Sequence, residues 1–201
     1  SHPLDMDDEL ITAHGDVPQL MPYLHLPIQS GSNHVLAAMN RRHTTHVYLA
    51  VIEKLRAVRP DIAMSGDFIV GFPGETDNDF EKTLNFIKNL KLNYLHVFPY
   101  SERDNTRSKG FGDIVSKETK EKRSKILRSL SEKLKRNFYE KNINKEHDVL
   151  FENKKDKNYI YGFTDNYVRV KVPYNKKLIG SVKRTHLYDI DSDSNVLGEI
   201  I

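Results

Sequence analysis

Three short apolar segments alternate with amphipathic segments in the first hundred residues, and this alternation limits the fold more than any other feature. Strands that are apolar on both faces are typical of a parallel sheet that helices cover. Hydrophobic residues at helical spacing lie between and after these segments. We predict strands at Met21–Ile28, Ile62–Val70 and Asn93–Ser101, and helices at Asn33–Asn40, His46–Pro60 and from Thr76 or Asp77 to Asn89.

The same spacing predicts the buried face of each helix. Two complete strand–helix units and a third strand are too few to close a barrel or to finish a doubly wound sheet. We therefore predict part of a larger α/β domain. The residues expected to face its core are Val35, Leu36 and Met39 in the first helix, Val47, Leu49, Ala50, Val51, Leu55 and Val58 in the second, and Phe80, Leu84 and Ile87 in the third.

The second half changes its pattern twice. Residues 104–115 predict a polar loop, and Lys117 to about Asn144 predict one long helix whose core positions are Leu127, Leu130, Leu134 and Phe138. From His147 onward apolar and polar residues alternate, with turn signals at Asn153–Lys157 and at Thr164–Asn166. Four or five short strands in this length favour a small antiparallel barrel. We predict two domains, at residues 1–145 and 146–201.

Composition limits the setting and the partners. The 201 residues are 38% hydrophobic and 29% charged. They hold no apolar run of about 18 residues and no signal-peptide pattern, so we predict a cytosolic protein without a membrane span. The net charge of +3 is uneven, because residues 1–100 hold 8 Lys and Arg against 12 Asp and Glu and the remainder hold 23 against 16. A basic second half favours a polyanionic partner, although a solvated lysine surface explains it equally well.

The ends of parallel strands are where such sheets bind ligands. After the first strand, the Gln29 amide is suited to a sugar hydroxyl, Gly31 would let a ligand approach the backbone, and Arg41 could grip a carboxylate. The alternative is that Gln29 and Ser32 only cap a helix and that Arg41 is a surface residue.

The second strand carries Asp67 among apolar residues, and such a carboxylate requires a partner. Gly71 and Gly74 would let backbone groups reach an adenine edge. A tight turn with Glu75 near a helix start is an equally good interpretation. His25, His34, His43 and His46 show no consistent ligand face, so we predict no metal site from them. Neither a Ser-His-Asp arrangement nor a P-loop pattern is present.

The basic second half mixes cations with aromatic residues, as RNA-binding barrels do. A solvated barrel surface with tyrosines partly in the core is the alternative. The aromatic residues are Tyr159, Tyr161, Phe163, Tyr167 and Tyr174. The predicted RNA-binding cations are Arg169, Lys171, Lys176, Lys177, Lys183 and Arg184.

Four motifs in one order carry a family resemblance: SHP with DM near the start, LPIQSGSNHVLAAMNRRHT, DFIVGFPGET and LHVFPYSERDNT. Together they resemble the radical S-adenosylmethionine (SAM) methylthiotransferases, and the tail from about residue 146 resembles their RNA-binding TRAM domain. The resemblance implies a partial parallel (β/α) barrel of radical SAM type followed by a TRAM-like barrel. Family members hold two iron–sulfur clusters, of the 4Fe–4S type, on cysteines. This chain has no cysteine, so we expect the cluster-bearing N-terminal domains to be missing from it and the chain alone to be inactive.

The resemblance also assigns roles to the strand-end residues. It implies that Gln29, with Ser30 beside it, and Asp67 contact the ribose of SAM. It implies that Arg41 binds the methionyl carboxylate of SAM and that Ile69, Val70 and Gly71 line its adenine. These assignments agree with the chemistry of the side chains, which suits an amide to a sugar and a guanidinium to a carboxylate.

For the substrate, the resemblance implies a modified adenosine at position 37 of tRNA, in the anticodon loop, which would receive a methylthio group at C2. Up to about residue 83 the chain is similar to enzymes acting on isopentenyl-adenosine. After that it is more similar to those acting on threonylcarbamoyl-adenosine. Two alternatives remain: a methylthiotransferase that acts on an aspartate of a ribosomal protein, and a non-catalytic RNA-binding protein.

Overall fold

The computed structural model describes residues 2–102, 110–156 and 158–201. Residues 104–109 of the predicted loop lie outside this part. Contacts divide the chain into a first unit (Ser1–Leu20 and Leu24–Leu134) and a second unit (Met21–Tyr23 and Lys135–Ile201). The predicted domain boundary near residue 145 stays a prediction.

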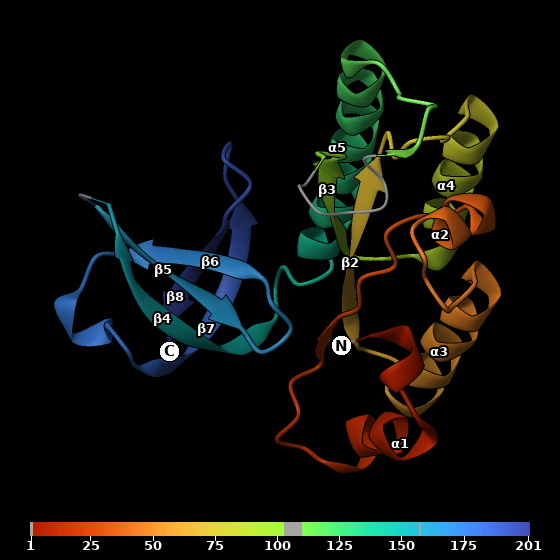
Figure 1. Cartoon of the computed structure of the whole chain (residues 1–201). Helices are drawn as coiled ribbons and strands as arrows, with labels where there is room; N and C mark the ends of the chain where they lie inside the picture. Colours follow the sequence, from red (N-terminus) through yellow and green to blue (C-terminus); the bar gives the residue numbers. More distant parts are fainter. Residues whose placement is uncertain (1, 103–109, 157) are drawn as a thin grey trace. The chain divides into compact units, whose positions relative to one another are not determined.

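A three-stranded sheet in the order β1–β2–β3 organises the first unit (Figure 1). Strands β2 and β3 are parallel, and Gln29 forms an isolated parallel bridge with Phe68. The predicted parallel sheet is therefore confirmed. The predicted first strand, Met21–Ile28, was too long, because only three of its residues form a regular strand. The strands are β1 (Tyr23–His25), β2 (Ala63–Val70) and β3 (Tyr94–Pro99).

Helices occupy the segments between these strands. Thr76 caps α4 with a complete capping box, as the sequence predicted for the helix start. The last helix, α5, ends four residues before the predicted Asn144. The helical elements are η1 (Pro3–Asp5), α1 (Asp8–Asp16), α2 (Asn33–Ala38), α3 (Thr45–Val58), α4 (Asp77–Leu90) and α5 (Lys117–Glu140). Among the described residues, no helix has the length and apolar character needed to cross a bilayer.

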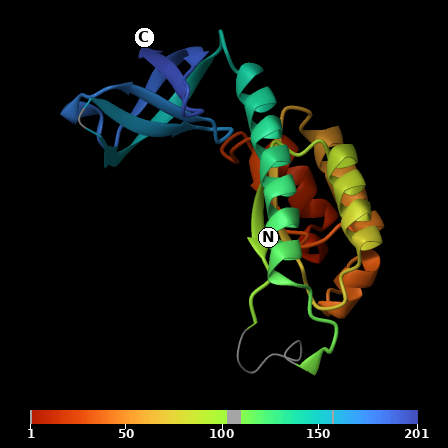
Figure 2. The same cartoon turned by 90° about the horizontal axis from the view of Figure 1, so that it is seen from above.

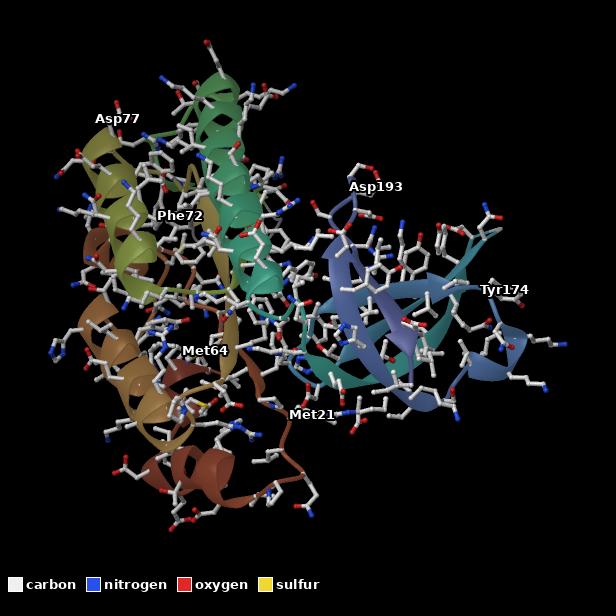
Figure 3. The ribbon with its side chains drawn as sticks, turned by 180° about the vertical axis from the view of Figure 1, so that it is seen from behind. Met21, Met64, Phe72, Asp77, Tyr174 and Asp193 are labelled. Atoms are coloured by element: carbon white, nitrogen blue, oxygen red, sulfur yellow. The ribbon has the colours of Figure 1, made fainter. Side chains whose placement is uncertain are left out.

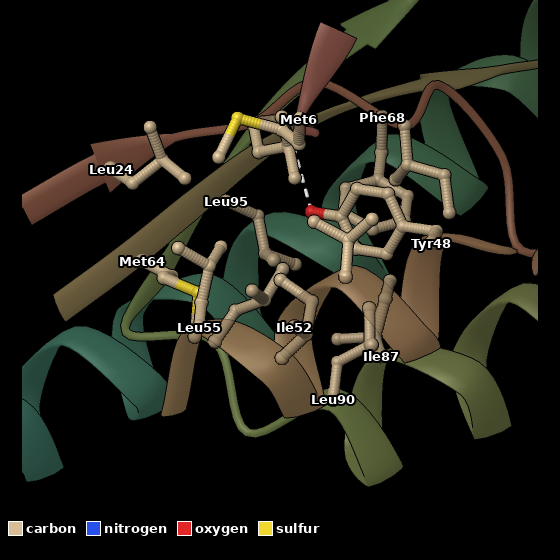
Figure 4. Packing of buried hydrophobic residues seen from close by; sticks show 14 of the residues in the cluster. Met6, Leu24, Tyr48, Ile52, Leu55, Met64, Phe68, Ile87, Leu90 and Leu95 are labelled. Atoms are coloured by element: carbon tan, nitrogen blue, oxygen red, sulfur yellow. Dashed lines mark hydrogen bonds between the residues drawn. The ribbon is translucent and has the colours of Figure 1, made fainter. Parts of the chain in front are cut away.

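The core of the first unit lies between the sheet and the helices (Figure 4). On α3 the predicted face was partly wrong, since Val47 and Val58 are exposed whereas Tyr48 is fully buried. The reason is a polar contact inside the core, in which the Tyr48 hydroxyl donates to the Leu26 carbonyl oxygen at 2.7 Å. That bond lets a large aromatic ring fill the core without an unpaired hydroxyl.

The two faces of the sheet differ. Alternate residues of β2 and β3, such as Phe68 and Leu95, are buried in the helix-covered core. Helix α5 runs alongside β3, where the Ser131 hydroxyl donates to the Leu95 carbonyl oxygen at 2.9 Å (Figure 2). On the opposite face Ser65 is buried, and the side chains farther along the strands are partly or fully exposed. This open face carries His25, Asp67, Ile69, His96 and Phe98.

The second unit contains a closed five-stranded barrel in the order β4–β5–β6–β8–β7. The predicted barrel is confirmed, with two corrections. Strands β6 and β8 pair in parallel, so the barrel is not wholly antiparallel. The turn predicted at Asn153–Lys157 is wrong in its first part, because β4 continues to Lys155. The strands are β4 (Glu146–Lys155), β5 (Tyr159–Thr164), β6 (Arg169–Pro173), β7 (Val182–Ile190) and β8 (Val196–Ile200), and the short helix η3 (Lys176–Leu178) precedes β7.

Candidate functional site

Gln29 adopts an uncommon backbone conformation at the end of the first strand segment. Its φ is 81°, in the left-handed region. Its N–H donates to the Asp67 carbonyl oxygen at 2.9 Å, and its own carbonyl oxygen accepts from Ile69 N at 2.9 Å. A non-glycine residue in this region costs about 1–2 kcal/mol, and such residues cluster at functional sites. The conformation supports a functional role for Gln29.

The next three residues are fixed against α4. The Ser32 hydroxyl donates to Asp79 Oδ1 at 2.7 Å. It makes no side-chain capping bond to α2, unlike in the alternative interpretation of Ser32 as a helix cap. The Gly31 N–H donates to Thr83 Oγ1 at 3.1 Å. The Ser30 hydroxyl accepts from Ser32 N at 3.1 Å and lies 3.4 Å from Thr83 Oγ1. Ser30 is therefore buried and engaged within the turn, and its predicted contact with a cofactor stays a prediction.

Asp79 holds this turn in place, a role that was not predicted. Burial on its own would raise the pKa of Asp79, but hydrogen bonds from Ser32, Thr76 and His34 outweigh burial and hold that pKa well below its usual range. The carboxylate is therefore ionised at neutral pH. It ties the Gln29 turn to the first turn of α4 by accepting from both segments.

Gly31 packs closely against α4. A Cβ at this position would lie 2.6 Å from Thr83 Cα and 2.8 Å from Phe86 Cβ. The side of Gly31 that a Cβ would occupy is therefore filled by α4, and the predicted approach of a ligand to its backbone stays a prediction. Glycine is required here because the turn packs directly on the helix backbone.

Arg41 follows α2 and is half-buried. Its backbone N–H donates to the Leu36 carbonyl oxygen at 2.9 Å, which fixes the chain after the helix. Within the described part of the chain, the guanidinium makes no ion pair with a carboxylate. It is therefore available for an anionic group from outside the chain, as its predicted role requires.

A buried ion pair holds the turn after β2. The Arg123 side chain donates to Glu75 Oε1 at 2.5 Å and to Asp77 Oδ1 at 2.7 Å, and Glu75 Oε1 also accepts from Gly71 N at 3.0 Å. Burial raises the pKa of Glu75 above its ordinary value, although Gly71 and Arg123 act to lower it. Figure 3 shows Asp77 at the start of α4 and Phe72 in the turn. The sequence led to two interpretations of this segment, a ligand-binding turn and a tight turn near a helix start. Neither included Arg123, which lies on α5.

This arrangement leaves few backbone groups for an adenine. The Gly71 N–H is bonded to Glu75, the Val70 carbonyl oxygen accepts from Tyr100 N at 2.8 Å, and Gly74 N donates to Asp113 at 2.8 Å. The side chain of Val70 is buried in the core. Of the predicted segment from Ile69 to Gly71, only the Ile69 side chain lies on the open face. The predicted adenine contact of Ile69, Val70 and Gly71 stays a prediction.

Asp67 has the partner that its position required. Its Oδ1 lies 3.3 Å from His25 Nε2 on the open face. The other predicted histidines have different surroundings: His34 bonds to Asp79, His46 is exposed, and His43 is buried. Burial lowers the pKa of His43, so this side chain is neutral in the folded protein at neutral pH.

Comparisons with known proteins identify the family of the chain. Residues 2–87 match the model of the radical SAM superfamily. A tRNA-2-methylthio-N(6)-dimethylallyladenosine synthase of Agrobacterium fabrum is 52% identical over 152 residues, which are 76% of this chain and 33% of that protein. The chain belongs to the radical SAM methylthiotransferases.

The radical SAM fold is also seen among solved structures. Coproporphyrinogen III oxidase of Escherichia coli, described as a radical SAM enzyme, superposes with a TM-score of 0.56 at 18% identity, over 66% of this chain and 31% of that one. This likeness concerns the fold alone. The chain spans about a third of the length of the curated relative that it matches.

The barrel of this methylthiotransferase chain carries the predicted RNA-binding cations in two different states. Lys171 forms an ion pair with Asp191, which raises the pKa of Lys171, and its ammonium lies 4.5 Å from the Tyr159 ring centroid. Arg184 Nε lies 3.4 Å from Glu146 Oε2. Arg169 stacks on a tyrosine ring. By contrast, Lys176, Lys177 and Lys183 are exposed and form no ion pair within the described residues.

The predicted aromatic residues also differ in their availability. Tyr167 lies between two rings, with centroids 4.4 Å from Tyr23 and 4.6 Å from Phe163. These two stacking contacts reduce the ring area of Tyr167 that a base could use, although the residue is 42% exposed. The Tyr161 ring carries the Arg169 guanidinium at 4.8 Å from its centroid. An arginine over a ring offers its own outer plane to a base.

Proposed function

We propose that this chain supplies part of the SAM pocket and the RNA-binding barrel of a tRNA methylthiotransferase. The complete enzyme would add a methylthio group to C2 of a modified adenosine at position 37 of tRNA. The observation that carries this proposal is the 52% identity with a protein named as a tRNA-2-methylthioadenosine synthase. We expect the enzyme to act in the cytoplasm, where its tRNA substrate is found.

The strand ends fit the ribose and carboxylate of SAM. Gln29 and Asp67 would contact the ribose, and Arg41 would bind the carboxylate. Ile69 would pack on the adenine, with Ser30, Val70 and Gly71 shaping the backbone around it. Two observations support this assignment: the guanidinium of Arg41 has no carboxylate partner among the described residues, and the backbone of Gln29 is left-handed. SAM bound to a 4Fe–4S cluster supplies the radical chemistry of the family.

The cluster cannot be held by this chain. Cysteine thiolates are the usual ligands of iron–sulfur clusters, and the 201 residues hold none. The ligands would have to come from cluster-bearing domains outside these residues. We therefore propose that the chain by itself does not cleave SAM reductively, even after iron and sulfide are added.

Arg41 offers a test of the cofactor pocket that does not need turnover. In a protein that includes the cluster-bearing domains, we expect Arg41→Lys to weaken SAM binding about tenfold or more, because lysine keeps the charge but lacks the bidentate fork. Equilibrium dialysis with labelled SAM measures the change. Arg42→Lys, beside it and exposed, is the control. Unchanged affinity in the Arg41 variant would favour the non-catalytic RNA-binding alternative.

The barrel, as a TRAM-like domain, would hold the anticodon loop of tRNA. Lys183 forms no ion pair with the residues that the structure describes, whereas Arg184 is paired with carboxylates, so these adjacent residues of β7 make a matched test. We expect Lys183→Ala to reduce the slope of log affinity against log salt by about one, whereas Arg184→Ala leaves it nearly unchanged. Gel-shift titrations with tRNA at several salt concentrations measure both slopes.

Two outcomes of the tRNA titration would contradict the proposal. Absence of binding at low salt would favour the alternative in which a ribosomal protein aspartate is the substrate. Equal loss of slope in both variants would show that the ion pairs of Arg184 do not decide which cations meet phosphate.

A further inference from the structure

Three side chains converge on the open face from three adjacent strands: His25 on β1, Asp67 on β2 and His96 on β3. Asp67 and His96 are direct neighbours in the parallel register of β2 and β3. One nitrogen or oxygen from each of the three side chains lies within 4.8 Å of the other two. His25 Nε2 and Asp67 Oδ1 are the closest pair, at 3.3 Å.

A hydrogen bond to Ser65 fixes the orientation of the His25 ring. Its Nδ1 lies 2.8 Å from the hydroxyl oxygen of Ser65, which is fully buried on β2. This bond leaves Nε2 directed toward Asp67. A metal-bound imidazole commonly has its other nitrogen hydrogen-bonded in this way, because the bond fixes the ring and its tautomer.

The carboxylate beside His96 in the register of β2 and β3 is that of Asp67. The His96 ring meets those of His25 and Tyr94 edge to face, with centroid distances of 5.4 Å in both cases. These aromatic contacts direct the imidazole across the open face toward the His25–Asp67 pair. The side chains of His25 and Asp67 are 34% and 24% exposed, so an ion could reach the group from solvent.

We propose that His25, Asp67 and His96 form a binding site for one divalent transition metal ion. Two imidazoles and one carboxylate are a ligand set that suits zinc, iron and cobalt, and three protein ligands leave at least one position open. Ligand bonds of about 2.0–2.2 Å require the three groups to move closer together, which side-chain rotation on an accessible face permits. The open position would face outward from the sheet.

A simpler arrangement, an ion pair between His25 and Asp67, explains only two of the three residues. It makes no use of His96, so His96 discriminates between the two possibilities. The proposal does not depend on the proposed tRNA methylthiotransferase function. It is also compatible with a ribose contact from Asp67, because a carboxylate has a second oxygen.

The test uses the untagged 201-residue chain and two probes, Zn²⁺ by calorimetry and Co²⁺ by its visible absorption. We expect one ion per chain. His96→Ala should weaken binding at least about tenfold, and Ser65→Ala should weaken it about 10–100-fold by freeing the His25 ring. His46→Ala, on the exposed start of α3, is the matched control and should bind as the parent does.

Circular dichroism of each variant checks that it is folded, and His96→Asn provides a polar replacement of similar size. The proposal is overturned if binding is not saturable at one ion per chain, or if His96→Ala and His96→Asn bind Zn²⁺ as tightly as the parent. Loss of metal binding in a chain that still binds tRNA would leave the proposed function intact. Loss of tRNA affinity with metal binding retained would affect only the proposed function.

Discussion

Replacing Arg123 by alanine is expected to destabilise the chain by about 3–5 kcal/mol, because it leaves the carboxylate of Glu75 buried without its cation. The side chains of Arg123 and Glu75 are only 5% and 3% exposed. Arg123 also donates to the Glu75 carbonyl oxygen at 3.2 Å. The loss therefore removes three hydrogen bonds and the only cation that the described residues place against this carboxylate.

Thermal unfolding followed by circular dichroism measures the effect, which corresponds to a decrease in Tm of about 10 °C in a chain of this length. Asp77→Ala is the matched control. It removes the other partner of Arg123, but the Asp77 side chain is 98% exposed, so we expect little change. Adding Glu75→Gln to Arg123→Ala should recover part of the lost stability, since the amide carries no charge to be buried.

The pH dependence gives an independent check of the Arg123 variant. Without Arg123, burial raises the pKa of Glu75 further, because the two lowering effects of the guanidinium are gone. A carboxyl group whose pKa is raised on folding binds its proton more tightly in the folded state, so the variant should gain stability relative to the parent as pH falls from about 7 to about 5. A gap that stays constant over this range would contradict the role given to Glu75.

Local signals in the sequence were sufficient for most elements of the fold. Thr76 begins α4 because its hydroxyl and Asp79 satisfy each other's backbone N–H groups, a signal contained within four residues. The alternation in the second half predicted a barrel because each strand buries every second residue, as β5 does. Such patterns are readable because the interactions that produce them join near neighbours.

The errors arose where a distant partner decides the structure. Spacing favoured Val47 as a core residue of α3, yet Tyr48 occupies the core since the Leu26 carbonyl, 22 residues earlier, accepts its hydroxyl. Arg123 was not predicted because its carboxylate partner precedes it by 48 residues. A lysine- and arginine-rich helix contains many equivalent cations, and only the packing selects one of them for burial.

The same distinction between local signals and distant partners applies to the candidate site. Side-chain chemistry and family resemblance assigned cofactor contacts to Gln29, Asp67 and Arg41, and these assignments stay predictions. The structure places Gln29 after β1, Asp67 within β2 and Arg41 after α2. The contact of Gly31 with α4 was not predicted, because a glycine next to a ligand and a glycine next to a helix give the same sequence pattern. The short distances from a Cβ at Gly31 to Thr83 and Phe86 show the helix contact.

The barrel adds a further limit to prediction from composition. Counting cations gave six candidate RNA contacts, yet Lys171 is neutralised by Asp191 while Lys183 remains free within the described residues. Charge in a sequence is additive, whereas charge on a surface depends on which carboxylates lie nearby. The second half therefore offers fewer phosphate contacts than its net charge suggests, and η3 and the start of β7 provide the exposed ones.

Replacing Gly31 by alanine is expected to be the most damaging change in the turn from Gln29 to Ser32. The added Cβ would meet the Cα of Thr83 and the Cβ of Phe86 at less than 3 Å. Both atoms belong to the rigid part of α4, so the turn must move away from the helix, at a cost of about 1–3 kcal/mol. That movement would stretch the bond from Gly31 N to Thr83 Oγ1 and shift Gln29 away from Asp67.

Thermal unfolding measures the stability loss, and protection of the backbone amides of Gln29 and Ile69 in hydrogen exchange measures the shift of the turn, because these amides pair Gln29 with β2. Gly112→Ala is the matched control, since nothing lies within 4 Å of its Cβ position and its φ is not positive. We expect that control to change stability by less than about 0.5 kcal/mol. A Gly31→Ala variant as stable as Gly112→Ala, with Gln29 and Ile69 equally protected, would show that the turn does not depend on its contact with α4.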